Sequence, residues 1–245
     1  HIKRLKLVGP QVWASRPGRA KTLAKVVDHL FCIHSFEAPF YEGTGLPVTV
    51  IGNPALGRVE AGNGGNFRRR YELADASVLL VLPGSRNSEI KRVAPILADT
   101  SRFLCENDNN LNVAVLVSPS VREALYQSDI SWPENTLFIE DTAQKSDAMA
   151  AATLALACSG TVTTELATQS APMIVGYKVG WLTWAVARFL LFKGQFITLL
   201  NVAAGREIVP EFVQTRFSAR KLADDAAELL RNEDARQRQI SDQTE

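Results

Sequence analysis

The sequence predicts an α/β protein built on parallel sheets, and three observations support this prediction. Short apolar runs such as Leu79–Leu82 are typical of strands that are buried on both faces, as in parallel sheets. Stretches with helical periodicity lie between such runs, for example from Ile90 to Leu104. Two of the runs end in a glycine turn that leads into a helix, as repeated strand–helix–strand units require.

Residues 1–56 alternate strands and helices over short elements. We expect strands at 5–9, 30–33 and 48–51. The helices are expected at about 17–27 and near 38–43. Residues 57–77 are rich in Gly, Asn and Arg, with a glycine- and asparagine-rich centre at 62–66. This composition predicts an interdomain linker or a mobile loop.

The alternation is clearer over residues 78–200. Strands are expected at 78–82, 112–117, 136–139, 153–157 and 173–176. The mostly apolar segment 181–192 predicts a helix that either packs in the core or faces lipid. The C-terminal segment 201–245 is expected to contain a short helix opened by Pro210 and an amphipathic helix from about 219 to 230. The polar tail after this helix has little to bury.

The chain of 245 residues suits one large or two modest domains, and its 46% hydrophobic and 22% charged content is ordinary for a globular protein. Lys and Arg number 27 against 26 Asp and Glu, which argues against a general nucleic-acid binder. The first 27 residues nevertheless carry seven Lys or Arg and no acidic residue. This local charge favours an anionic partner such as a phospholipid surface, or else it forms a solvated helix face.

The three cysteines, Cys32, Cys105 and Cys158, are widely spaced and lie in apolar contexts. They indicate buried thiols in a reducing cytoplasm and not a disulfide framework or a zinc site. No signal peptide is visible, and the longest apolar run, 181–192, is shorter than the ~20 residues that span a bilayer. Because His1 leads directly into strand-like sequence without an initiator Met, the chain is expected to be cut at its start.

The first glycine turn follows the strand at 78–82 and has the features of a phosphate site. Gly84 ends the strand, Ser85 is a candidate N-cap, and the next helix begins near Arg86. Free N–H groups and the positive end of the helix attract an anion, and Arg86 can add a bidentate clamp. An ordinary strand–helix turn with a surface arginine explains this stretch equally well.

A second turn of the same kind, Ser159-Gly160-Thr161, follows the strand at 153–157. Ligands of open parallel sheets bind outside the carboxyl ends of the strands, so the two turns can converge on one diphosphate. Glu165 lies one turn into the next helix, where it either accepts hydrogen bonds from ribose hydroxyls or is a simple N-terminal helix charge. Neither turn matches the usual dinucleotide or ATP fingerprint, so the pair indicates a nucleotide diphosphate held by backbone amides.

Six groups of motifs occur in a fixed order and cover the chain from about residue 7 to residue 230. They are Pro10–Ala14 with Arg16–Arg19, Phe36-Glu37 with Phe40-Tyr41, Leu82–Arg86 with Glu89-Ile90, Ser159–Thr161 with Glu165, Pro172–Lys178, and Asn201–Gln214. Together they resemble the lipid-A-disaccharide synthase family of inverting glycosyltransferases, which has the GT-B architecture. Each motif alone is weak, but the ordered set is specific.

The resemblance implies a GT-B-like α/β protein with a Rossmann-type parallel sheet as its donor domain and the remnant of a second α/β domain. Residues 1–56 are then the remnant of an N-terminal, acceptor-side domain, and residues 57–77 are the linker or mobile loop. Residues 78–200 are expected to form the UDP-sugar-binding domain, and residues 201–245 a C-terminal helical segment.

The resemblance also implies the reaction, in which a diacylglucosamine unit passes from a UDP-linked donor to diacylglucosamine 1-phosphate and UDP leaves. No metal ion and no cofactor is expected, because helix ends and Arg86 do the work that a divalent ion does in other sugar transferases. Preorganised donors that face the diphosphate lower the barrier to breaking the anomeric bond. The implied site has Gly84, Ser85 and Arg86 on the phosphates with Ser159, Gly160 and Thr161 opposite, Glu165 on ribose, and Asn201, Arg206, Glu211 and Gln214 completing the nucleotide-sugar pocket.

The chain departs from the family pattern at several positions. Gly52-Asn53-Pro54 stands where the family usually has Gly-His-Pro, and it is closer to the related peptidoglycan N-acetylglucosaminyltransferase. The other departures are Ser15 for Trp, His34-Ser35 for Leu-Pro, and Leu200 for Pro. The family's N-terminal half-domain, with its Gly-rich acceptor loop and the aspartate proposed as general base, has no counterpart in this sequence. No histidine of the chain is therefore assigned as the base.

The leading hypothesis is an enzyme of lipid A and lipopolysaccharide biosynthesis in a Gram-negative cell. It would be cytoplasmic and peripheral on the inner face of the inner membrane, with an anionic membrane surface as a partner and no nucleic acid. Another GT-B transferase, such as the peptidoglycan enzyme, and a non-catalytic nucleotide-sugar-binding module are the alternatives. The chain as written is expected to bind UDP and to form no disaccharide, because its general base is expected upstream.

Overall fold

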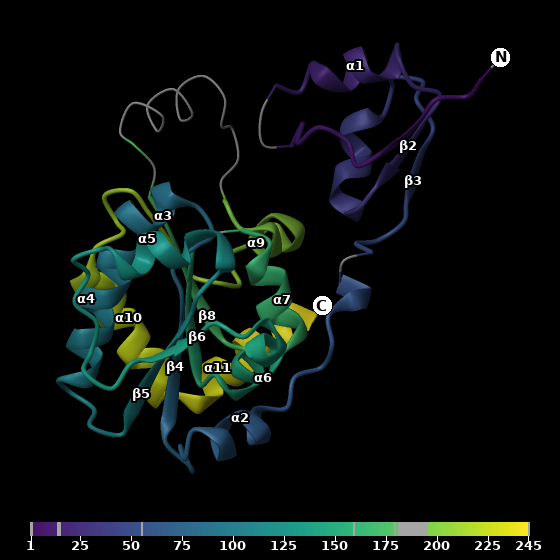
Figure 1. Cartoon of the computed structure of the whole chain (residues 1–245). Coiled ribbons are helices and arrows are strands. Elements are labelled where there is room, and N and C mark those ends of the chain that lie inside the picture. The colour runs from purple at the N-terminus through teal and green to yellow at the C-terminus, as the bar shows by residue number, and fades with distance from the viewer. Residues whose placement is uncertain are drawn as a thin grey trace. The chain divides into compact units, whose positions relative to one another are not determined.

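The computed structural model describes residues 2–13, 16–54, 56–158, 160–178, 180 and 196–244 (Figure 1). The chain divides into two compact units. The first is His1–Arg58 with Gly180–Ile197, and the second is Val59–Val179 with Thr198–Glu245. Each unit has its own parallel sheet and its own hydrophobic core.

The first unit has a small parallel sheet in the order β1-β2-β3. Its elements are β1 (Leu5–Leu7), α1 (Arg19–Ala24), β2 (His29–Cys32), the 3-10 helix η1 (Ser35–Tyr41), β3 (Val48–Val50) and the 3-10 helix η2 (Leu56–Arg58). The three expected strands are confirmed, and the helix expected near 38–43 is η1. Leu30 and Cys32 of β2 are buried with Tyr41 against α1 and η1, whereas Leu5 and Leu7 of β1 are 61% and 57% exposed.

The second unit contains a six-stranded, all-parallel sheet in the order β6-β5-β4-β7-β8-β9. Numbered along the chain from β4, this is the 3-2-1-4-5-6 order of a Rossmann-type sheet, so that part of the predicted fold is confirmed. The strands are β4 (Ser77–Leu82), β5 (Leu111–Leu116), β6 (Leu137–Ile139), β7 (Leu154–Cys158), β8 (Met173–Tyr177) and β9 (Glu211–Val213).

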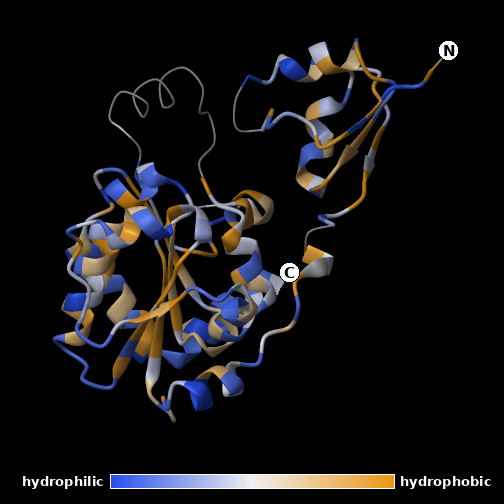
Figure 2. Ribbon diagram, in the orientation of Figure 1, coloured by the Kyte–Doolittle hydropathy of each residue, from blue (hydrophilic) through white to orange (hydrophobic). Residues whose placement is uncertain are grey.

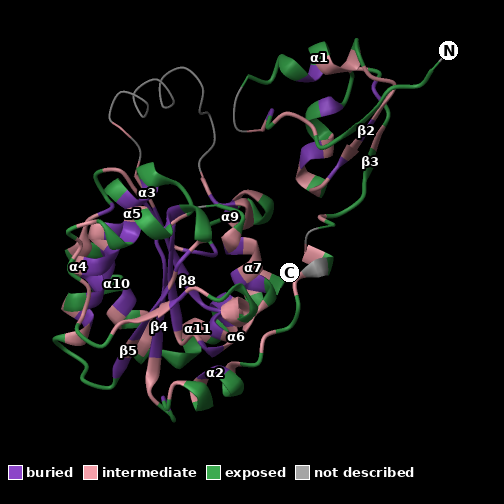
Figure 3. Cartoon of the chain, in the orientation of Figure 1, coloured by how far each residue is buried: buried purple, intermediate pink, exposed green. Residues whose placement is uncertain are grey.

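Helices cover both faces of this sheet, as right-handed crossovers require. They are α2 (Gly64–Arg70), α3 (Asn87–Arg92), α4 (Ala94–Cys105), α5 (Arg122–Tyr126), α6 (Lys145–Ala151), α7 (Val162–Thr168), α9 (Leu199–Ala204), α10 (Ala219–Arg231) and α11 (Glu233–Thr244), with 3-10 helices η3 (Pro119–Val121) and η4 (Thr142–Gln144). Alternate residues of β4 point to opposite faces: Leu79 and Val81 pack in one core cluster, and Leu80 and Leu82 in the other. The central strands are accordingly the most hydrophobic and most buried part of the unit (Figures 2 and 3).

The glycine-rich stretch at 62–66, expected as part of a linker or mobile loop, belongs to the second unit and packs within it. Residues from Gly64 onward form α2, which contacts α6 and buries Phe67. The Gly62 amide donates to Gln169 Oε1 at 2.8 Å, and a Cβ at Gly62 would overlap with the backbone of α6. At Gly62 and Gly64 the backbone of α6 approaches too closely for a Cβ, which composition alone does not distinguish from mobility.

The C-terminal segment also differs from the expectation. The short helix expected after Pro210 is instead strand β9, which pairs in parallel with β8. The polar tail expected to bury little forms α11, whose Gln239 is only 6% exposed. The Gln239 side chain accepts a hydrogen bond from Met173 N (2.6 Å) and donates one to Met173 O (3.0 Å), so a polar side chain completes the backbone pairing where β8 begins.

The apolar helix expected at 181–192 lies outside the described residues. In the part of the chain that the structure describes, no helix has the length and apolar character needed to cross a bilayer.

Candidate functional site

The two glycine turns lie beside each other at the carboxyl edge of the sheet in the second unit. Strands β4 and β7 are neighbours, and Leu82 pairs with Ala157 just before the turns begin. From these two strands the chain continues to opposite sides of the sheet, to β5 on one side and to β8 on the other. A crevice at such a switch point is where open α/β sheets bind nucleotides. The two turns therefore follow neighbouring strands at one edge of the sheet, and their convergence on one diphosphate stays a prediction.

The first turn is shaped by Gly84. Its φ of +114° is a conformation that favours glycine, and a Cβ there would lie 2.6 Å from Glu89 Cβ. Helix α3 follows. Its N-cap residue is Arg86, whereas the sequence predicted Ser85. The Ser85 carbonyl accepts a hydrogen bond from Ser120 Oγ at 2.8 Å, which ties this turn to the loop after β5.

The amides of the first turn face a side chain of the protein itself. Glu89, which is 5% exposed, accepts hydrogen bonds through Oε2 from Ser85 N (2.8 Å) and Arg86 N (3.2 Å). Its Oε1 pairs with Arg86 Nη1 at 2.7 Å. These N–H groups were expected to be free for a phosphate. The structure corrects that expectation, because a carboxylate three residues after the N-cap reaches back to the helix start in a capping box.

The second turn is open by comparison. Gly160 and Thr161 are exposed, and within the described part of the chain their amide N–H groups have no hydrogen-bond partner. Thr163 Oγ1 donates to Gly160 O at 2.9 Å, and Thr164 Oγ1 donates to Thr161 O at 2.6 Å. These hydroxyls hold the turn from the helix side. Ser159 lies outside the described residues.

Glu165, expected on ribose, forms an ion pair with Lys145 at the start of α6. Both side chains are partly exposed, so the pair lies at the surface between α6 and α7. In this structure the Glu165 carboxylate therefore bridges two helices.

Asn201 and Glu211, expected to line the sugar pocket, are buried and bonded to each other. Asn201 is 0% exposed; its Nδ2 donates to Glu211 Oε1 and to Val209 O, both at 2.8 Å. Its Oδ1 accepts from Ile208 N (2.8 Å) and Val209 N (2.9 Å). Glu211 Oε1 also accepts from the amide and hydroxyl of Thr198. These side chains hold the segment before β9 to the start of α9.

Arg206 and Gln214, also expected to line the sugar pocket, lie apart from each other. Arg206 forms a two-pronged pair with Asp242 of α11, with Nη2–Oδ1 at 2.8 Å and Nη1–Oδ2 at 3.2 Å. Gln214 directly follows β9 and donates its amide to Tyr177 O at 3.1 Å. Its φ is +54°, which few non-glycine residues adopt. Gln214 thus shares the carboxyl edge with the two turns.

The interior beside the first turn is apolar. Burial, with a contribution from the negative charge of Glu89, raises the pKa of the Cys158 thiol to about 12, while Arg86 opposes the rise. Cys158 is therefore a neutral thiol at the end of β7. Cys32 is also buried as expected, whereas Cys105 is only half-buried.

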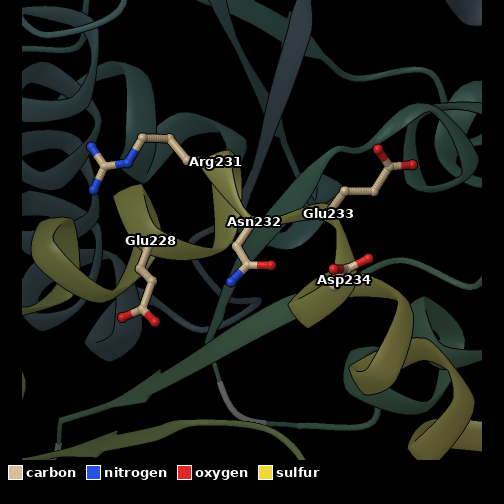
Figure 4. A pocket seen from close by; sticks show the side chains of 5 residues that line it. All are labelled: Glu228, Arg231, Asn232, Glu233 and Asp234. Carbon is tan, nitrogen blue, oxygen red and sulfur yellow. The ribbon is translucent and has the colours of Figure 1, made fainter.

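Two hollows of the described structure lie away from the glycine turns. One, of about 500 Å³, lies where α10 meets α11 and is lined by Glu228, Arg231, Asn232, Glu233 and Asp234, whose side chains point in different directions (Figure 4). The other, of about 410 Å³, includes Thr153 and Pro172, which precede β7 and β8 at the opposite, amino edge of the sheet. Among the described residues, no cluster of three His, Cys, Asp or Glu side chains could hold a metal ion.

Sequence reasoning missed the roles of Glu89 and Ser120. The Arg86-x-x-Glu89 spacing, which matches a capping box, was the available signal for the first. Ser120 could be found only from the sheet order, which places the loop after β5 next to the first turn.

Comparison with known proteins gives a consistent result. The model of the family described as lipid-A-disaccharide synthetase matches residues 1–245. A lipid-A-disaccharide synthase from Rhodospirillum centenum is 40% identical over 97% of this chain and 60% of its own length. The synthase from Granulibacter bethesdensis is 36% identical over 94% of this chain and 59% of its own length. The chain thus spans about three fifths of the length of these relatives.

Solved structures with other sequences share the fold. A UDP-GlcNAc 2-epimerase from Neisseria meningitidis bound to UDP-GlcNAc superposes with a TM-score of 0.58 at 12% identity, over 97% of this chain and 63% of that one. A putative UDP-N-acetylglucosamine 2-epimerase from Listeria monocytogenes gives a TM-score of 0.59 at 15% identity, over 89% of this chain and 55% of that one.

Proposed function

Since the chain belongs to the lipid-A-disaccharide synthetase family, we propose that it carries the UDP-sugar-binding part of a lipid-A-disaccharide synthase. The donor is a UDP-linked diacylglucosamine, and the acceptor is diacylglucosamine 1-phosphate. The observation that best supports this proposal is the pair of glycine turns at the switch point between β4 and β7, with Arg86 beside them.

The chemistry of this site suits a diphosphate leaving group. Breaking the anomeric bond leaves negative charge on UDP, and fixed donors aimed at that charge lower the barrier. The exposed guanidinium of Arg86 and the open amides of Gly160 and Thr161 are such donors. We assign Gln214, at the same edge, a contact with the nucleotide sugar. The general base and the acceptor-binding wall are not assigned to described residues.

Calorimetric titration of the 245-residue chain with UDP tests this proposal. We expect saturable binding that weakens by about 1.5–3 kcal/mol in Arg86→Ala, the range for hydrogen bonds to a charged group. Arg102→Ala is a matched control, since Arg102 pairs with Asp99 on the surface of α4. Unchanged affinity in folded Arg86→Ala would reject the assignment. Assays of the full-length protein with each acceptor in turn, diacylglucosamine 1-phosphate and the peptidoglycan acceptor, would show which of the two it uses.

We further propose that the protein works peripherally at an anionic membrane on the cytoplasmic side. The seven basic residues among the first 27 support this proposal, as do the exposed apolar side chains of β1. Cosedimentation with anionic vesicles is expected at low salt and is expected to fall as ionic strength rises. Binding that salt does not change would exclude an electrostatic contribution.

A further inference from the structure

We infer that Glu89 is a positioning residue of the diphosphate site. Its carboxylate occupies the anion site formed by the Ser85 and Arg86 amides, which we call the seat of the first turn, and it also holds the Arg86 guanidinium in place. The first turn then contacts a diphosphate through Arg86, and the second turn supplies the backbone amides. The inference rests on the proposed function and goes further, because it assigns different roles to two turns that look alike in the sequence: a side-chain contact for the first and backbone contacts for the second.

The seat of the first turn is occupied. Glu89 accepts from Ser85 N and Arg86 N through one carboxylate oxygen and from Arg86 Nη1 through the other, at 2.8, 3.2 and 2.7 Å. The side chain is buried against Gly84, whose missing Cβ makes room for it. A diphosphate oxygen at the same two amides would have to displace this carboxylate, since two anions cannot share one seat.

The Arg86 side chain is held and yet available. It is 72% exposed, although one of its terminal nitrogens is bonded to Glu89, so its other donors remain accessible to a ligand. An arginine that is ordered before binding does not lose its conformational freedom on binding. Arg86 and Glu89 follow β4, which pairs with β7, the strand that leads into the second turn.

The second turn leaves its described backbone amides accessible to a ligand. Gly160 has no neighbouring atom within 4 Å of a built Cβ, and it lies with Thr161 at the exposed end of β7. Within the described residues, the amides of Gly160 and Thr161 have no backbone hydrogen-bond partner, whereas the amides of Ser85 and Arg86 donate to Glu89. The open amides and the held guanidinium lie on adjacent strands, and both can address one diphosphate.

A double-mutant cycle with UDP tests the inference. Glu89→Gln keeps the shape and the acceptor oxygen of the side chain but removes its charge. We expect it to weaken UDP binding roughly two- to tenfold, the cost of ordering one long side chain on binding. In the Arg86→Ala background, Glu89→Gln is expected to have no effect, because Glu89 acts through Arg86. Asp99→Asn, which breaks an i,i+3 pair on α4, is the control for charge and should leave binding unchanged.

If UDP binds to the unaltered chain, three results would overturn the inference. They are tighter binding in Glu89→Gln, unchanged binding in Glu89→Gln, and equal losses with and without Arg86. Absence of UDP binding to the unaltered chain would instead refute the proposed function, and the inference with it.

Amide hydrogen exchange followed by NMR needs no variant and therefore does not depend on the folding of Glu89→Gln. Adding UDP should slow exchange at Gly160 and Thr161 and leave the Ser85 amide as protected as before, because Glu89 keeps it. Loss of Ser85 protection, or slowing at Ser85 alone, would show that the diphosphate takes the first seat.

Discussion

Replacing Asn201 by Ala should destabilise the second unit severely, because Asn201 satisfies backbone groups in the interior. The substitution leaves the amides of Ile208 and Val209 without an acceptor and removes a donor from Glu211. Each buried amide that loses its partner costs about 1–3 kcal/mol. With the lost bond to Glu211, we expect a decrease of about 3–5 kcal/mol in the free energy of unfolding, in the range of severe core defects.

Denaturant unfolding followed by circular dichroism measures this change, and peptide-level hydrogen exchange over 198–213 locates it. Asn107→Ala is the matched control, since Asn107 is an exposed asparagine that donates to Phe103 O at the end of α4. A folded Asn201→Ala chain with unchanged stability and weaker UDP-sugar binding would refute the reasoning. Asn201 would then contact the ligand directly, as the motif comparison implies.

The isosteric change Asn201→Asp adds a sharper test. It places a second carboxylate against Glu211 in the interior, and repulsion between like charges raises the pKa of the introduced Asp above its unfolded value. The folded state then binds more protons, so stability is retained below about pH 4 and is lost as the pH rises above it. A penalty that does not depend on pH would show that the two groups do not interact.

The remaining predictions concern the frame of the site. Gln239→Ala should cost about 2–4 kcal/mol, since it leaves both backbone groups of Met173 unpaired, and thermal unfolding against Gln237→Ala checks this. Gly62→Ala should expose α2 to fast hydrogen exchange, because a Cβ overlaps with the backbone of α6; Gly18→Ala, with open space around it, should not. Since burial raises the pKa of Cys158 from 9.0 to about 12, the unfolded state releases a proton that the folded state keeps, and stability should fall between these values. Cys158→Ala should remove about 1.4 kcal/mol per pH unit from the slope over this range, and an unchanged slope would exclude this thiol as a contributor.

The sequence predicts the sheets well, because strands buried on both faces leave an unmistakable apolar run. All five strands expected between 78 and 176 are present, and each turn residue expected at the switch point follows its strand. Strand β9 was missed because three residues next to a proline carry too little pattern to separate a strand from a short helix.

The site was predicted in outline but not in its contacts. Sequence order is enough to bring the turns after β4 and β7 to one edge. It does not reveal that Glu89 takes the amides of the first turn, or that Asn201 and Glu211 face each other in the interior, because the same residue types serve ligands and backbones equally well. The family resemblance identifies positions, and only the packing shows what those side chains contact.

The bond between Gln239 and Met173 has a consequence for the way this protein is made. The two residues are 66 positions apart, and the later one lies in the last helix of the chain. At a synthesis rate of roughly 5–20 residues per second, strand β8 waits about 3–13 s for its partner. During that interval the start of the strand has unpaired backbone groups beside an apolar core, which is the kind of nascent surface that attracts chaperones or neighbouring chains. Docking of α11 therefore completes the hydrogen bonding at the start of β8 during synthesis.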